Sequence, residues 1–222
     1  EMSFPNVIYG RYGDEKLAQS AAIGGLPLGQ KMILPDGREF VHAKAQTSGA
    51  LEPGKICVQG STIPDHGCGT ADQMVATAAA VGATTLVVTA GGTTAIAANY
   101  YDGGEAFVRD DTGEGYVYKI KSNNSTATGS TASITLEPTD PIVLAIGASA
   151  TVGLRRNPHR EVLTRPTGTA LTGPVIGVPV LAASAGFYTW LQKRGVGPGL
   201  MSGTAVVIGN PVVANTGVAG AL

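Results

Sequence analysis

The fold class is decided by one stretch in the last fifth of the chain, Gly186-Phe187-Tyr188-Thr189-Trp190-Leu191-Gln192-Lys193-Arg194-Gly195. It contains the single tryptophan of the sequence. Alternate side chains of a strand point to opposite faces, so Tyr188, Trp190 and Gln192 share one face, and Phe187, Thr189 and Leu191 share the other. Both faces are hydrophobic, which predicts a strand covered on both sides. We expect it to anchor a core or an interface through Tyr188, Trp190, Gln192 and Arg194.

The pattern of short strands continues outward from this stretch. Gly, Pro or Asn recurs at short intervals along the chain, and Thr, Val and Ile fill the spaces between. The clearest hairpin pairs residues 31–35 with 38–45 around Asp36-Gly37. Further strands are expected at 84–89, 95–99, 106–109, 116–121, 132–136, 142–146, 150–154, 175–182, 186–193 and 204–208. The sequence therefore predicts an all-β protein in which many short antiparallel strands form a sandwich or a barrel.

The sequence also predicts one short helix and a division of the chain into three regions. The helix is predicted at residues 14–22, with Asp14 as its N-cap and Gly24-Gly25 ending it. The regions are an N-terminal arm and hairpin at 1–72, a central β-rich region at 73–155, and a C-terminal β-region at 156–222. The third region is a candidate to complete one fold with the first.

The amino-acid composition is more typical of a protein that assembles into a larger structure than of an enzyme. The chain is 43% hydrophobic and only 14% charged, whereas an ordinary soluble domain has about 25% charged residues. This deficit predicts that much of the exterior is covered by copies of the chain or by a larger lattice. A net charge of −1 argues against a sequence-independent grip on nucleic acid. No apolar run approaches the roughly 20 residues that span a bilayer, so we expect no membrane segment.

Candidate chemical sites are weak. Cys57, Asp65, His66 and Cys68 are possible zinc ligands, but the spacing of the two cysteines fits no tetrahedral motif. A disulfide between Cys57 and Cys68 and two ordinary thiols both stay open, so the redox compartment is undetermined. An acidic, glycine-rich cluster lacks the pattern of a calcium loop, and a turn-rich surface explains it better; it comprises Asp102, Glu105, Asp110, Asp111 and Glu114. We therefore expect no catalytic residues, no metal and no cofactor.

Stretches in three parts of the chain resemble segments of known proteins. The run 186–195 followed by 204–209 resembles a glycine-aromatic segment of virion structural proteins of tailed bacteriophages, most of all head decoration (capsid cement) proteins. The stretches 81–86, 99–104 and 113–120 are similar to the middle region of many phage virion proteins, and so are 28–30 and 34–40 at the N-terminal side. Together these segments touch about two thirds of the chain, and the family has no catalytic motif.

The resemblance implies a non-enzymatic protein on an icosahedral head, often trimeric, that braces the shell against internal DNA pressure. Its partners would be the major capsid protein and copies of itself, and its location would be the capsid surface after synthesis in the host cytoplasm. Decoration proteins of the best-known type are about half as long as this chain. The alternatives are another virion component (major capsid, head fibre or tail protein), a secreted surface-layer or adhesin module, and a virion-borne glycan hydrolase.

Overall fold

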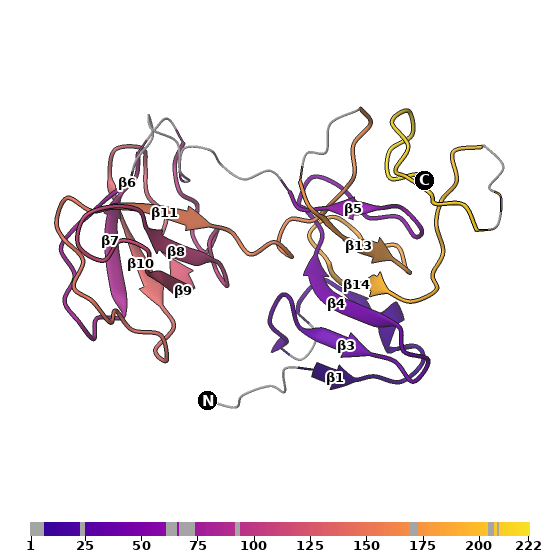
Figure 1. Cartoon of the computed structure of the whole chain (residues 1–222), viewed down its shortest axis with the longest axis horizontal. Helices are drawn as coiled ribbons and strands as arrows, with labels where there is room; N and C mark the ends of the chain where they lie inside the picture. Colours follow the sequence, from indigo (N-terminus) through magenta and orange to yellow (C-terminus); the bar gives the residue numbers. More distant parts are fainter. Residues whose placement is uncertain are drawn as a thin grey trace. The chain divides into compact units, whose positions relative to one another are not determined.

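The chain is divided into two domains. The computed structural model describes residues 7–22, 25–60, 66, 74–91, 94–168, 173–203, 207 and 209–222. The sheet domain combines Glu1–Ser61 with Pro158–Leu222, and the barrel domain is Thr62–Asn157 (Figure 1). Segments from both ends of the chain thus build one domain, and the barrel domain is inserted between them in the sequence.

The protein is all-β, which confirms the predicted fold class. Strands β1 to β14 make up the regular structure of the described residues, together with one 3-10 turn. No helix among them is long or apolar enough to cross a bilayer.

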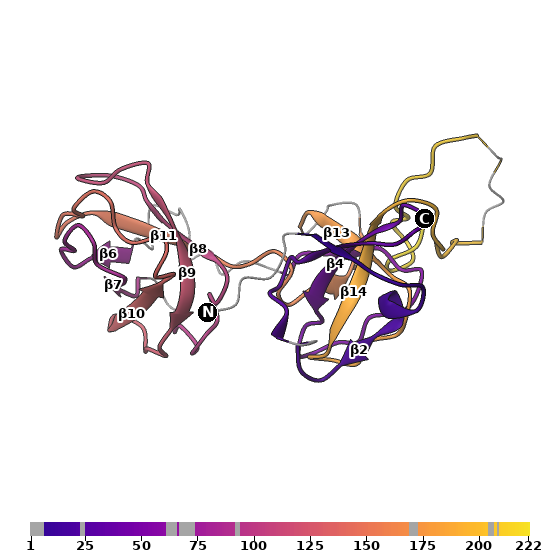
Figure 2. The same cartoon turned by 90° about the horizontal axis from the view of Figure 1, so that it is seen from below.

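The sheet domain contains a mostly antiparallel sheet in the order β1-β3-β4-β14-β13-β5-β12, with β2 paired to β14 (Figures 1 and 2). Its strands are β1 Val7–Tyr9, β2 Ala18–Gln19, β3 Lys31–Ile33, β4 Glu39–Lys44, β5 Cys57–Val58, β12 Leu163–Thr164, β13 Val175–Pro179 and β14 Tyr188–Arg194. A parallel bridge from Ala45 to Val162 connects the end of β4 to the residue before β12. With this bridge, the pairings among β4, β14, β13, β5 and β12 form a closed ring.

The predicted hairpin is confirmed as β3 and β4, which pair antiparallel with Ile33 opposite Glu39. The turn between them is closed by the Leu34 amide, which donates to the Arg38 carbonyl at 3.0 Å. Gly37 has φ of 80° there, a left-handed conformation that glycine adopts without a Cβ clash.

The two faces of β4 and β14 serve two different cores. One core lies inside the ring of pairings and includes Val41, Ala43, Cys57, Ile176 and Leu191. The other lies on the opposite face, and it contains Met32, Leu34, Phe40 and Trp190. Strand β14 is therefore buried on both faces, as its two hydrophobic faces predict.

The barrel domain is a closed antiparallel barrel in the order β10-β7-β6-β11-β8-β9. The strands are β6 Met74–Ala76, β7 Thr85–Thr89, β8 Glu105–Val108, β9 Val117–Asn123, β10 Thr131–Leu136 and β11 Thr151–Arg155. Closure removes free sheet edges, so every strand has two paired neighbours.

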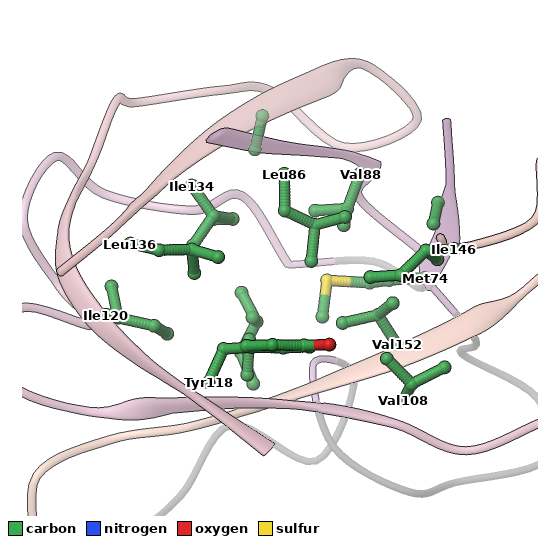
Figure 3. Close-up of a cluster of buried hydrophobic side chains, with 14 of the residues drawn as sticks. Met74, Leu86, Val88, Val108, Tyr118, Ile120, Ile134, Leu136, Ile146 and Val152 are labelled. Carbon is green, nitrogen blue, oxygen red and sulfur yellow. The ribbon is translucent and has the colours of Figure 1, made fainter. Parts of the chain in front are cut away.

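Alternation along each strand fills the barrel interior. Tyr118 and Ile120 of β9 point inward, and Ile134 and Leu136 of β10 meet them, whereas the residues between lie nearer to solvent. Figure 3 shows these side chains with Met74, Leu86, Val88, Val108, Ile146 and Val152 gathered in one cluster. The mixed pattern of 116–121 left its inward face undecided in the sequence, and the barrel selects the face with Tyr118 and Ile120.

The helix predicted at 14–22 is reduced to one 3-10 turn, Asp14–Lys16. Leu17 is already extended, and β2 follows it and pairs with β14. The cap also differs, because Asp14 Oδ2 accepts from the Arg11 amide instead of capping a helix. A helix this short is marginal on its own, so the backbone hydrogen bonds offered by β14 decide the conformation.

Two predicted strands are absent from the described residues. Residues 95–99 make only a bridge at Ile96, and residues 142–146 only a bridge at Ile146. In the second case the ends of the segment bond to residues 79–83, but Val143, Leu144 and Ala145 between them are exposed. Residues 204–206 and 208 of the strand predicted at 204–208 lie outside the described residues, and Val207 is not in a strand.

Candidate interaction surface

Trp190 belongs to the core of its own domain. Its side chain is 2% exposed and packs with Met32, Leu34 and Phe40 between β14 and the β3–β4 hairpin. The ring therefore anchors that core and offers no surface to a partner.

Tyr188 and Lys44 flank a buried histidine on the same face. The His42 ring is stacked on Tyr188 with centroids 5.5 Å apart, and Trp190 lies 5.2 Å away on the same strand. His42 Nδ1 lies 3.2 Å from the Pro27 carbonyl, and burial lowers the pKa of His42 below its usual value of 6.5. The Lys44 ammonium lies 5.4 Å from the Tyr188 ring centre, a cation–π contact at the rim. This cluster is structural, since hydrophobic and aromatic neighbours surround the ring.

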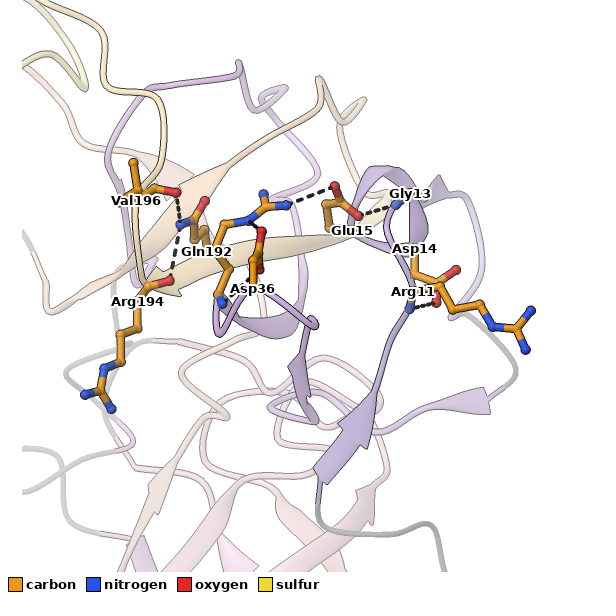
Figure 4. A network of polar contacts seen from close by, with 9 residues as sticks. Arg11, Gly13, Asp14, Glu15, Asp36, Gln192, Arg194 and Val196 are labelled. Atoms are coloured by element: carbon orange, nitrogen blue, oxygen red, sulfur yellow. Dashed lines mark hydrogen bonds and ion pairs between the residues drawn. The ribbon is translucent and has the colours of Figure 1, made fainter.

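Gln192 and Arg194 lie at the end of β14, where the strand leaves the sheet. Gln192 Nε2 donates to the carbonyls of Arg194 (3.2 Å) and Val196 (3.0 Å), which fixes the turn at Gly195 (Figure 4). Gln192 is 7% exposed, yet its Oε1 accepts no hydrogen bond from any described residue. Arg194 Nη1 lies 3.4 Å from Glu39 Oε1, and its guanidinium is largely exposed. These residues line a cavity of about 180 Å³ together with Val178, Lys193, Gly195, Gly197 and Pro198.

The segment 195–222, which follows this turn, has no Asp, Glu, Lys, Arg or His. It consists almost entirely of Gly, Val, Ala, Pro, Leu, Asn, Ser and Thr. The low overall charge predicts an apolar exterior for the whole chain, but it does not locate the deficit in this one segment. A window of charge along the sequence would have found it.

The two ends of this segment are held firmly on the sheet domain. The Leu200 amide donates to the Gly54 carbonyl, and the Leu222 amide donates to the Leu200 carbonyl, both at 2.8 Å. Buried Arg165 donates through Nη1 to the Asn215 carbonyl at 2.5 Å. Asn215 Nδ2 in turn donates to Ser202 Oγ at 2.8 Å. We call the anchored residues Leu200, Ser202, Asn215 and Leu222 the neck. The described residues between Ser202 and Asn215 extend away from it (Figure 2).

The part beyond the neck presents apolar side chains to solvent. Val207, Val212 and Val213 are exposed, Val213 by 78%. Backbone groups of residues 211–214 make no hydrogen bond to another described residue. Beside them lies a cavity of about 470 Å³, and the described side chains that line it are uncharged; they include Met201, Val207, Val212 and Leu222. An exposed apolar loop whose backbone groups are not bonded to other described residues is suited to binding another protein.

The candidate chemical residues form no metal site among the described residues. Cys57 is a buried free thiol whose pKa is raised to about 12 by burial, so it is protonated and inert near neutral pH. His66 belongs to the other domain, where Nε2 lies 2.9 Å from the Thr94 carbonyl and Nδ1 2.6 Å from the Tyr101 hydroxyl. Asp65 and Cys68 lie outside the described residues. Within the described part, no three His, Cys, Asp or Glu side chains group as metal ligands.

The acidic cluster is spread over strand β8 and the turns on either side of it in the barrel domain. Glu105 pairs with Arg155, and Asp110 Oδ1 accepts from the Thr151 amide at 2.6 Å, a bond that lowers the pKa of Asp110. Asp111 and Glu114 lie in the β8–β9 turn and are exposed. These carboxylates therefore belong to the polar surface of the barrel domain, as the sequence predicts.

Comparisons with known proteins found no match among family models, curated proteins or solved structures.

Proposed function

We propose that this chain is a non-enzymatic virion structural protein that decorates an icosahedral phage capsid and stabilises it by multivalent binding to the assembled shell. The observation that carries the proposal is the charge-free segment 195–222, which is anchored at its neck and exposes Val207, Val212 and Val213. The resemblance of 186–195 to phage decoration proteins supports the placement on a capsid. The low charge of the whole chain supports an assembled state.

Shell stabilisation follows from mass action. A protein that binds the assembled shell but not its dissociated subunits shifts the equilibrium toward the shell. Each contact can be modest because many copies act on one shell. The exposed valines would supply apolar contact area, and the backbone of 211–214, which bonds to no other described residue, would complete a strand edge of the capsid protein.

The test uses shells of the phage that encodes this chain, stripped of the protein, and measures rebinding by co-sedimentation. We expect the wild-type protein to bind and to raise the temperature at which the shells disrupt. The double variant Val212→Ser/Val213→Ser removes about 1.5 kcal/mol of apolar burial per residue, so shell affinity should fall about a hundredfold.

The matched control is Val117→Ser, which changes an equally apolar and exposed residue of the barrel domain. It should bind shells like the wild type. Wild-type protein that fails to sediment with shells, or a double variant that binds as tightly as the control, would contradict the proposed function.

A further inference from the structure

The two domains carry opposite net charge. By sequence, the sheet domain has ten Lys and Arg against seven Asp and Glu, a net charge of +3, whereas the barrel domain has five against nine, a net charge of −4. The two values sum to the −1 of the whole chain. The near-neutral total therefore conceals two domains of opposite net charge, and the unlike domains of two copies attract each other.

The positively charged sheet domain has a specific recess. Lys193 and Arg194 line the cavity at the end of β14. Arg194 also lies 3.4 Å from Glu39, whose carboxylate is contacted by Lys31 at 2.7 Å as well, so the cations here outnumber the carboxylate. Gln192 lines the same cavity with a buried Oε1 that has no donor among the described residues. A buried acceptor without a donor is unfavourable, because it has lost its hydrogen bonds to water. The recess is thus suited to a ligand that brings both negative charge and an N–H donor.

The negatively charged barrel domain has a turn with those two properties. The β8–β9 turn is closed by the Glu114 amide, which donates to the Asp111 carbonyl at 3.1 Å. Asp110, Asp111 and Glu114 place their carboxylates at the surface. Thr112, at the tip, is exposed, and its amide donates to no acceptor within the described ranges.

We propose that the β8–β9 turn of one copy docks in the β14 recess of a second copy. The carboxylates of Asp111 and Glu114 meet Lys193 and Arg194, and an amide of the turn donates to Gln192 Oε1. This inference rests on the self-association that the proposed function includes, and it names the two surfaces. Because the contact joins unlike patches, it is head-to-tail and closes into a ring when the rotation between copies allows, as in a trimer.

The experiment is a charge swap read by sedimentation velocity of the full chain, at about 0.05 M and about 0.5 M NaCl. The wild type should self-associate, and more weakly at the higher salt concentration. Lys193→Glu and Glu114→Lys should each raise the dissociation constant at least about tenfold, since each places like charges across the contact. The double variant Lys193→Glu/Glu114→Lys restores unlike charges at every contact, and it should regain most of the wild-type affinity.

Lys16→Glu is the control, because it makes the same charge change on an exposed residue of the sheet domain outside the recess. It should associate like the wild type. The inference is overturned by a wild type that stays monomeric at low salt, by single variants that match Lys16→Glu, or by a double variant that gains nothing. The salt dependence of the wild type tests it independently of any variant. Shell binding through 195–222 is measured separately, so either proposal can fail while the other stands.

Discussion

At the scale of single residues, the sheet domain depends on a few large side chains that lie between strands from distant parts of the sequence. Trp190 is opposite His42 in the β4–β14 register, and its ring fills the space under Met32, Leu34 and Phe40. Since the second core has few other buried members, the loss of this ring cannot be absorbed by neighbours.

We predict that Trp190→Ala lowers the free energy of unfolding of the sheet domain by about 3–5 kcal/mol, the cost of emptying a fully buried aromatic site. Urea denaturation followed by circular dichroism measures the change. The control Val196→Ala removes a side chain that is 92% exposed and should cost at most about 0.5 kcal/mol. Equal stabilities of the two variants would show that the ring is not part of a core.

At the scale of elements, the β4–β14 pair encloses a titratable group. His42 is fully buried, and its neighbours on this face are Tyr188 and Trp190, with Lys44 at the rim. Burial favours the neutral ring and lowers the pKa in the folded state. The unfolded chain therefore binds more protons at this histidine than the folded chain does below about pH 6.5.

The sign of the pH effect follows from this difference. Above the unfolded pKa of about 6.5, His42 is neutral in both states and the native packing keeps its full stability. As the pH falls below that value, the unfolded state gains the proton first and the sheet domain loses stability. Urea unfolding at about pH 7.5 and about pH 5.5 should show this loss, and His42→Gln should reduce it. If His42→Gln keeps the same pH dependence, the effect belongs to another group.

At the scale of the whole molecule, the two domains differ in how they depend on the chain. The barrel domain is one continuous segment with a closed ring of strands and its own core. The sheet domain needs both ends of the chain, because β4 pairs with β14 and β5 with β13.

We expect a fragment of residues 62–157 to fold alone and to unfold cooperatively, since its strand pairings and core lie within it. Dispersed amide resonances in an NMR spectrum and a single thermal transition would show this. The control fragment, residues 1–61, lacks β13 and β14 and should remain unfolded. A disordered 62–157 fragment would mean that the barrel requires the other domain.

The alternation of side chains and the sequences of turns are local features, and much of the fold is predicted from them. The all-β class, the hairpin at Asp36-Gly37 and the two covered faces of the Trp190 strand all follow from patterns within a few residues. In the strand predicted at 84–89, Leu86 and Val88 lie together on the inner face of β7, as expected for residues two apart in a strand.

Pairing and closure were decided only by the tertiary structure. Residues 14–22 have a helical pattern, yet Ala18 and Gln19 pair with β14, which is far away in the sequence. Nothing local shows that β11 closes the barrel onto β6, or that Gln192 Oε1 has no donor among the described residues in a recess beside two cations. Such features depend on which backbone groups meet after the chain collapses, and hydrogen bonds between distant strands then outweigh weak local preferences.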